Sequence, residues 1–327
     1  MDLTADSQAM LLLCSHLGLS DETGPKPFTL GEWNSLARKL PQSSLAAPGR
    51  LLGSSADDLR AELALSDTEA GRLGQLLNRG GALAVELERL ESLGIWIVTR
   101  ADEQYPQRLK QRLKRAAPAL LFGAGERALL GQPGLAVVGS RNVDDHGKTC
   151  ADLVGNACGR EGLVLYSGGA RGVDAVSTQA ALDARGTAVG VLAHSLERAI
   201  RAPDARSKLE SGDLVFVTPY SPNAGFSVGA AMGRNKLIYA LADYALVIAS
   251  DAGKGGTWAG AIEAINAKWL PLFVLDGPNV PEGNCQLLQK GAISFPDSLF
   301  TPSLDLREWL QAQVPAFAPS PEQARLF

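Results

Sequence analysis

The stretch Leu163–Leu182, LVLYSGGARGVDAVSTQAAL, most constrains how this chain can fold. A short apolar run typical of a strand ends at Ser167, a glycine-rich turn follows, and a helical pattern begins after Gly172. Glycines let the backbone turn sharply and let a ligand approach its amides. The first amides of the following helix have no intrahelical partners and carry partial positive charge, so the turn predicts an anion-binding site. Arg171 adds a permanent cation whose planar donors suit phosphate oxygens.

The turn therefore supplies a first set of candidate phosphate contacts, namely Ser167, Gly168, Gly169, Arg171 and Gly172. Asp174 needs a separate interpretation, because a carboxylate in a phosphate site would repel the ligand. We expect Asp174 to accept hydrogen bonds from loop amides and so to fix the shape of the turn.

Short apolar strands alternate with helices on both sides of this stretch. Strands are expected over 135–139, 163–167, 188–192, 214–218, 244–250 and 270–275, and helices over 147–160, 173–185, 227–242 and 260–267. Such alternation predicts an α/β fold with a doubly wound, mostly parallel sheet covered by helices on both faces. Ligands of these sheets bind beyond the carboxyl ends of the strands, where the connecting turns meet.

Further turns at this edge also combine glycines with bases. The candidate residues are Ser140 and Arg141 after the strand over 135–139, the segment Lys254, Gly255, Gly256 and Thr257, and Arg234, Asn235 and Lys236 in GRNK. One glycine turn is routine in this fold, but its recurrence beside a base favours a ligand with several phosphates. A row of cations suits a nucleic-acid backbone and predicts affinity that falls steeply with salt. Tyr220, Phe226 and Trp258 are near enough to stack bases, although each could equally belong to the core.

The chain of 327 residues is long enough for two domains. A small helical domain is expected over 1–93, the α/β domain over 94–300, and a short helix with a proline-rich tail over 301–327. Helices are expected over 6–17, 28–40, 55–65, 66–79 and 80–93, with Thr29 as a cap and Ser66 with Glu69 as a capping box. The basic segment over 105–115 has two interpretations, a solvated helix face or a phosphate-contacting one.

Composition excludes several classes of protein. The content of 46% apolar and 20% charged residues is ordinary for a globular protein, and no apolar run approaches the roughly 20 residues of a membrane span. The first residues carry acids and no base before a short apolar run, so we expect no secretory signal and a cytoplasmic location. The 4 cysteines lack C-x-x-C spacing and the 3 histidines match no catalytic or metal motif, so no catalytic residue, metal or cofactor is expected. With a net charge of −4, nucleic-acid binding requires a local basic patch.

The motifs VVGSR, SGGARGVDAVSTQAAL, GRNKLIYALADYALVIAS, GGTWAGAIEA and NCQLLQKGA together resemble the DNA-processing protein A family (DprA, also called Smf). The likeness runs from about Ile95 to Ala292. It implies an extended Rossmann fold that forms a homodimer, binds single-stranded DNA without sequence preference and helps to load a RecA-type recombinase in DNA recombination and transformation of competent bacteria. The family's DNA-contacting turns correspond to Ser140 and Arg141, to Ser167, Gly168, Gly169 and Arg171, to Arg234, Asn235 and Lys236, and to Gly255–Thr257.

The chain resembles a divergent member of that family. Lys236 stands where the family has a second arginine, and VTPYSPNAGFSVGAAMGRNK replaces its usual proline-rich stretch. The family's C-terminal winged helix is expected to be absent, since only residues 301–327 follow the α/β domain.

An alternative function comes from nucleotide-processing enzymes of the same superfamily. GKGGTWAGAIEA partly matches the Pro-Gly-Gly-x-Gly-Thr-x-x-Glu signature of phosphoribohydrolases, with Glu263 as the acid or base and a mononucleotide as the ligand. The leading proline is missing and the spacing from Thr257 to Glu263 is too long, so a glutamate on a helix face is the preferred interpretation. A nucleotide sensor without turnover is a third alternative.

The tail carries a separate motif. Its prolines predict an extended leader, and it ends in Gln323-Ala324-Arg325-Leu326-Phe327. This resembles the Q-x-x-L-F peptide that docks on the replication sliding clamp, with Gln323, Leu326 and Phe327 as the contacts. The alternative is a tail that folds back on its own domain.

Overall fold

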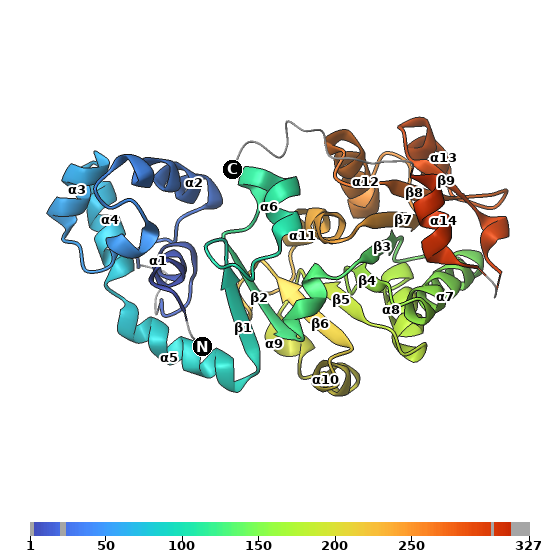
Figure 1. The fold of residues 1–327 in the computed structure, drawn as a ribbon, viewed down its shortest axis with the longest axis horizontal. Helices are drawn as coiled ribbons and strands as arrows, with labels where there is room; N and C mark the ends of the chain where they lie inside the picture. Colours follow the sequence, from blue (N-terminus) through green and yellow to red (C-terminus); the bar gives the residue numbers. More distant parts are fainter. Residues whose placement is uncertain (1–2, 20–23, 302–303, 315–327) are drawn as a thin grey trace. The chain divides into compact units, whose positions relative to one another are not determined.

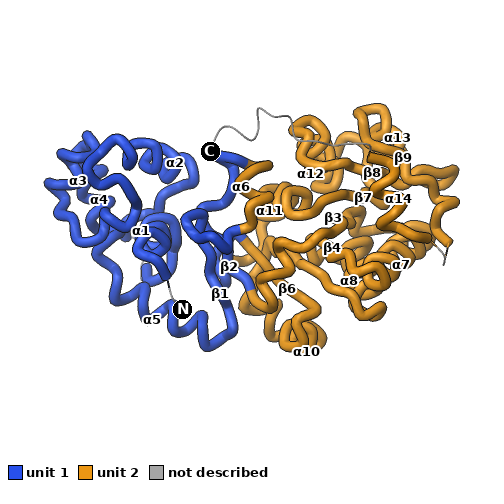
Figure 2. The backbone as a smooth tube through the Cα atoms, viewed as in Figure 1, with its two compact units in different colours: residues 1–105, 114–123, 219–222 blue, residues 106–113, 124–218, 223–327 orange. Residues whose placement is uncertain are grey.

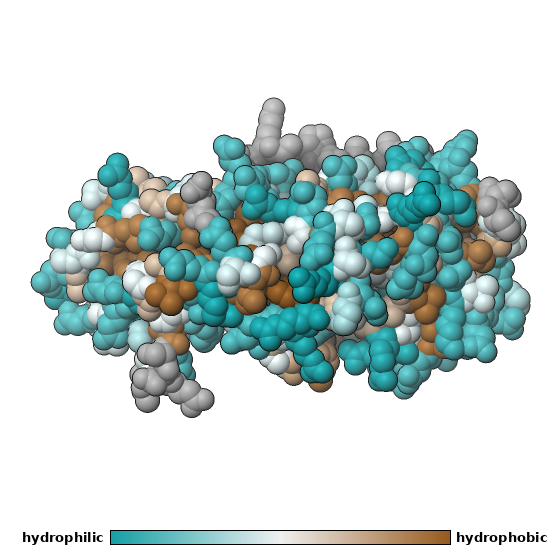
Figure 3. Space-filling view, turned by 90° about the horizontal axis from the view of Figure 1, so that it is seen from below, coloured by the Kyte–Doolittle hydropathy of each residue, from teal (hydrophilic) through white to brown (hydrophobic). Residues whose placement is uncertain are grey.

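The computed structural model describes residues 3–19, 24–301 and 304–314. The chain forms two compact units (Figure 2): unit 1 holds residues 1–105, 114–123 and 219–222, and unit 2 holds residues 106–113, 124–218 and 223–327. Across the described ranges, the helices are all too short or too polar to cross a membrane. The face drawn in Figure 3 is largely hydrophilic with apolar side chains scattered across it, as expected for a surface in contact with water.

Unit 1 is mainly helical. Its elements are α1 (Ala5–Cys14), α2 (Leu30–Lys39), η1 (Leu40–Gln42), η2 (Pro48–Leu51), α3 (Ala56–Leu63), α4 (Asp67–Leu77), α5 (Gly80–Ser92), β1 (Ile95–Thr99), η3 (Lys114–Ala116) and most of β2 (Leu120–Gly125). The Ser66 hydroxyl accepts from the amide of Glu69 at 3.3 Å, and the Glu69 carboxylate accepts from the amide of Ser66 at 2.9 Å, so the expected capping box at α4 is confirmed. The helices expected over 1–93 correspond to α1–α5, and unit 1 continues through β1 to residue 105.

The strands of unit 2 form a parallel sheet. They are β3 (Gly134–Gly139), β4 (Val164–Ser167), β5 (Ala188–Val191), β6 (Leu214–Thr218), β7 (Tyr244–Ala249), β8 (Leu272–Asp276) and β9 (Ile293–Pro296), in the spatial order β6-β5-β4-β3-β7-β8-β9. Every pairing in this order is parallel. The chain runs outward from β3 to β6 and then returns to the other side of β3 with β7, so the order switches between β3 and β7. Such a switch point is where parallel sheets bind their ligands.

Helices cover both faces of this sheet (Figure 1). Its helices are α6 (Gln107–Leu113), η4 (Arg127–Gly131), α7 (Asp145–Arg160), α8 (Val173–Asp183), α9 (Leu196–Ala199), α10 (Pro203–Glu210), α11 (Val228–Leu241), α12 (Gly255–Ala267), α13 (Glu282–Gln289), η5 (Asp297–Leu299) and α14 (Leu306–Gln313). The helices α7 and α8 lie on one face, and α11 and α12 lie on the other. The core between sheet and helices includes Leu135, Val137, Leu165, Leu246 and Phe273. The expected α/β class with a mostly parallel sheet is confirmed.

The sequence placed most of these elements within a few residues and missed others. The helix expected over 260–267 begins at Gly255, so Gly255–Thr257 form the first turn of α12 and not a loop before it. The sequence analysis did not predict the strands β2 and β9 or the short helices α9, α10 and α13. The start of α12 was predicted too late because the helix begins with two glycines, and glycine has a low helix propensity.

Candidate functional site

Arginines of α6 hold the carboxyl end of α11, the helix that carries the GRNK residues. Arg108 Nη1 donates to the carbonyl of Leu241 at 3.0 Å, and Arg112 Nη1 donates to the carbonyls of Tyr239 at 3.3 Å and Ala240 at 3.2 Å. Cationic side chains at a helix C-terminus satisfy carbonyls that lack intrahelical partners and oppose the helix dipole. Burial lowers the pKa of Arg112 to about 10, so its guanidinium stays charged at neutral pH. At these two arginines the basic segment is neither a solvated face nor a phosphate contact, because both side chains position α11.

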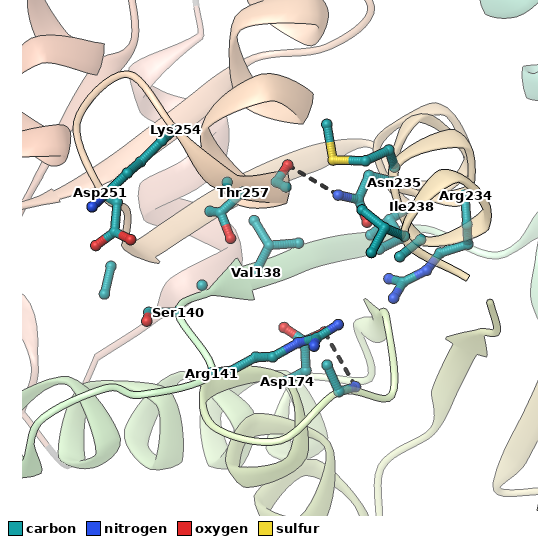
Figure 4. Close-up of a pocket in the computed structure, with 18 of the residues that line it drawn as sticks. Val138, Ser140, Arg141, Asp174, Arg234, Asn235, Ile238, Asp251, Lys254 and Thr257 are labelled. Carbon is teal, nitrogen blue, oxygen red and sulfur yellow. Dashed lines mark hydrogen bonds between the residues drawn. The ribbon is translucent and has the colours of Figure 1, made fainter. Parts of the chain in front are cut away.

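Beyond the end of β3 lies a cavity of about 420 Å³. Figure 4 shows its contributors: Ser140 and Arg141 from the end of β3, Arg234 and Asn235 from α11, and Lys254 and Thr257 from the start of α12. A second cavity of about 270 Å³ lies beside it and is lined by Arg141, Gly168, Gly169, Ala170, Arg171, Ala193, His194, Phe226 and Arg234. The structure thus gathers turns from distant parts of the sequence at the switch point of the sheet.

Asp174 organises the turn between β4 and α8. Its Oδ2 accepts hydrogen bonds from the amide of Gly168 at 3.1 Å and from the amide of Ala170 at 3.4 Å. Burial raises the pKa of Asp174 to about 6, although the charge of Arg234 and these amides act to lower it. The geometry is that of a buried carboxylate that fixes the backbone of the turn.

Some predicted contacts lie away from the cavities. Ser167 is 1% exposed, and its hydroxyl donates to the carbonyl of Val137 at 2.8 Å, so its hydroxyl proton is used within the sheet. Gly172 has a φ of +82° and lies against the backbone of Ser140 and Arg141, where a Cβ would clash. Gly172 and Lys236 line neither cavity.

Two residues of GRNK, Arg234 and Asn235, line a cavity, and their side chains make different contacts. Arg234 lines both cavities but is 5% exposed, so most of its side chain contacts protein. Asn235 donates from Nδ2 to the carbonyl of Gly256 at 2.9 Å, which ties α11 to the first turn of α12. A Cβ at Gly256 would lie 2.8 Å from the same Nδ2, so this close approach requires glycine.

Exposed cations and one exposed aromatic ring line the cavities. Arg141, Arg171 and Lys254 are exposed. The guanidinium carbon of Arg141 lies 5.5 Å from the ring centroid of Phe226, within cation–π range. Phe226 is 54% exposed and lines both cavities, whereas Tyr220 and Trp258 line neither. Together with Val228 and Met232, Phe226 forms an exposed apolar rim on the larger cavity.

Sequence reasoning missed several polar residues of the site, and Tyr239 and His194 are among them. Tyr239 lines the larger cavity one helical turn after Asn235, so the i, i+4 spacing on α11 was the available signal. His194 lines the smaller cavity just after β5, and the carboxyl-edge rule could have found it. Burial lowers the pKa of His194, and the charges of Arg234 and Arg198 lower it further, so the ring is neutral at neutral pH.

The remaining predictions concern residues elsewhere. Glu263, the acid or base of the phosphoribohydrolase alternative, is exposed on α12 and lines neither cavity. The tail residues Gln323, Leu326 and Phe327 lie outside the described residues.

The fold and the site define a class: a parallel α/β unit of Rossmann-like topology with two cavities, bordered by Arg141, Arg171 and Lys254, at its switch point. Residues 96–299 match the model of the family "DNA recombination-mediator protein A", and the chain belongs to that family. The chain is 26% identical over 208 residues to the DNA processing protein DprA of Bacillus subtilis (strain 168), covering 61% of this chain and 67% of that protein. It is 29% identical over 216 residues to DprA of Streptococcus pneumoniae, covering 64% of this chain and 72% of the relative.

Solved structures show the same fold. The X-ray structure of DprA from Streptococcus pneumoniae aligns with a TM-score of 0.57 at 22% identity, covering 82% of this chain and 95% of that one. A structure of DprA from Helicobacter pylori, described for its single-stranded DNA binding mode, aligns with a TM-score of 0.54 at 23% identity, covering 67% of this chain and 96% of that one.

Proposed function

We propose that this chain binds single-stranded DNA through backbone phosphates at the two cavities and acts as a recombination mediator of the DprA type. Family membership and the DNA-binding relative from Helicobacter pylori support the proposal. The observation that carries it is the convergence of Arg141, Arg171 and Lys254, from turns far apart in the sequence, around adjoining cavities. This is the local basic patch that a chain of net charge −4 needs to bind a polyanion.

The site suits an unpaired strand better than a duplex. Phe226 presents an exposed ring at the rim, and an aromatic face can stack on a base only when that base is not enclosed in a duplex. Stacking and phosphate contacts do not depend on which base is present, so we expect little sequence preference.

The function that we propose is binding without turnover. Glu263 is outside both cavities, and Asp174 is held by amides of its own loop. We further propose, from the family, that the chain acts in the cytoplasm as a homodimer and assists a RecA-type recombinase.

Docking of Gln323, Leu326 and Phe327 on the sliding clamp is a separate proposal. Deleting Leu326 and Phe327 should abolish clamp pull-down, and an unchanged pull-down would end it.

Fluorescence anisotropy with a labelled oligothymidylate tests the main proposal. Wild-type affinity should fall steeply with salt, and Arg171→Ala should weaken binding and reduce the slope of log K against log salt by about 0.7, the value for one lost contact on a single strand. Arg206→Ala, exposed on α10 away from the cavities, is the matched control and should keep the wild-type slope. Duplex of the same length should compete poorly. Unchanged binding by both Arg171→Ala and Arg141→Ala would reject the site.

A further inference from the structure

The end of the basic segment over 105–115 plays no part in the cavities. Arg108 and Arg112 hold α11, whereas Lys114 and Arg115 belong to unit 1, where both side chains are exposed in η3. Every residue that lines the two cavities belongs to unit 2. For Lys114 and Arg115 the choice between a solvated face and a phosphate contact is therefore still open.

Asn34 gathers further cations beside these two. Its Nδ2 donates to the carbonyl of Arg115 at 2.8 Å, and its Oδ1 accepts from Nη1 of Arg100 at 2.9 Å. Its main-chain carbonyl accepts from Nε of Arg38 at 3.3 Å. One asparagine thus brings together arginines from α2, from η3 and from the residue that follows β1. We call Asn34, Arg38, Arg100, Lys114 and Arg115 the Asn34 cluster.

The charge of the Asn34 cluster is not balanced by acids. Within the described ranges, none of its four cations forms an ion pair. The acids that are close in sequence are Glu32, Asp102 and Glu103. Glu32 pairs with Arg72 at 2.6 Å, and Asp102 accepts from the amide of Thr99 at 2.7 Å. Glu103 is exposed, so water screens its charge. In a chain of net charge −4, such a cluster attracts anions to one part of unit 1.

Lys114 adds charge together with backbone strain. Its φ is +51°, in the left-handed region that glycine and asparagine adopt more readily than lysine. Backbone preference therefore does not explain a lysine at this position. The position also offers a substitution, Lys114→Asn, that removes the charge without straining the turn.

The composition of the cluster favours a phosphate backbone over an acidic protein. The planar donors of arginine match phosphate oxygens, and the cluster contains three arginines. Protein interfaces depend mostly on aromatic and apolar anchors, and no member of the cluster is apolar. No aromatic side chain is exposed in the described part of unit 1, so base stacking is not available there. A surface that contacts phosphates alone does not require unpaired bases.

We propose that the Asn34 cluster is a second nucleic-acid-binding surface, which contacts the phosphates of duplex DNA through Arg38, Arg100, Lys114 and Arg115. Asn34 is its positioning residue. The inference goes beyond the proposed function and does not depend on it, because the cluster shares no residue with the cavities.

Anisotropy titrations of the full chain with a labelled duplex test this surface. The double variant Lys114→Asn with Arg115→Gln should bind the duplex more weakly, and the slope of log K against log salt should fall by about 0.9 for each lost contact. Its thermal stability should not fall, because both side chains are exposed and asparagine relieves the strain at position 114. Arg60→Gln is the matched control. Arg60 is an exposed base of unit 1 that already pairs with Asp67 at 2.8 Å, so this variant should keep the wild-type slope.

The outcomes separate this surface from the cavities. An unchanged duplex affinity and slope in the double variant would overturn the proposal, while the effect of Arg171→Ala on oligothymidylate would still report on the cavities. Poly-glutamate should displace the labelled duplex less well than unlabelled duplex of equal total charge. Better displacement by poly-glutamate would assign the surface to an acidic protein and overturn the assignment to DNA.

Discussion

The guanidinium of Arg234 lies against the bare backbone of Gly168: a Cβ at position 168 would lie 2.5 Å from Cζ of Arg234, closer than two carbon atoms can pack. The absence of a side chain at Gly168 therefore lets Arg234 reach the turn that Asp174 holds. Two motifs that are separate in the sequence, SGGARG and GRNK, meet at this contact.

Gly168→Ala should consequently disturb the site. The added methyl group forces Arg234 out of place, and such overpacking costs typically 1–3 kcal/mol. We expect a drop of about that size in the free energy of unfolding in urea, together with weaker binding of oligothymidylate. Gly71→Ala in α4, where a Cβ would meet no neighbour within 4 Å, is the control and should stabilise by up to about 1 kcal/mol. A Gly168→Ala variant as stable and as active as wild type would contradict the packing described.

Phe226→Ala tests the stacking surface. Because Phe226 is 54% exposed, its removal should leave the thermal stability unchanged. Affinity for oligothymidylate should fall by about 1–3 kcal/mol, the usual worth of one base–aromatic stack. Val85, another exposed apolar side chain at 68%, gives the matched variant Val85→Ala with wild-type affinity expected. Equal affinities of the two variants in anisotropy titrations would exclude stacking at Phe226.

Asp174 makes stability depend on pH. Its pKa is about 6 in the folded chain against an ordinary value of 3.8, so the folded state keeps this proton where the unfolded chain loses it. The contribution of Asp174 to stability is therefore present below about pH 4 and lost as the pH rises through about 6. Relative to wild type, Asp174→Asn should gain stability between pH 4 and pH 7, by up to about 3 kcal/mol for a shift of about two units.

Urea unfolding at several pH values measures this difference. Asp204→Asn, which changes an exposed acid on α10, should follow the wild-type pH curve. Parallel curves for Asp174→Asn and wild type would show that the carboxyl does not titrate as inferred.

Arg112→Ala tests the anchoring of α11. The substitution removes a donor to the carbonyls of Tyr239, Ala240 and Ala242, and leaving such partly buried acceptors unsatisfied costs about 1–3 kcal/mol. Binding should weaken as well, since α11 carries Arg234 and Asn235. Gln111→Ala, an exposed position of the same helix, should change neither property. Loss of stability without any loss of binding would show that α11 keeps its place by other contacts.

The sequence allowed the sheet to be predicted because strands buried on both faces read as short apolar runs, and β3, β6 and β7 match their expected ranges within a residue. The convergence of the turns followed from the rule that parallel strands end at one edge. The strand β9 was missed because most of its residues are only partly buried, and its ISFP segment lacks a long apolar run.

The side chains of the site were harder to predict than its backbone. Ser167 and Arg234 have residue types that suit phosphate, but the fold turns the first into the sheet and buries most of the second. Tyr239 falls in the apolar run LIYAL, which is typical of a buried helix face, so the sequence pattern did not indicate that Tyr239 lines the cavity. Which way a polar side chain points depends on tertiary packing, and a one-dimensional pattern does not carry that information.

Arg141 and Phe226 border both cavities, so this pair links an occupant of one cavity to an occupant of the other. An occupant that moves this pair in one cavity alters the free energy of binding in its neighbour, and such linkage acts equally in both directions. Successive units of a strand would then engage cooperatively, and short fragments would lose more affinity than their missing contacts account for.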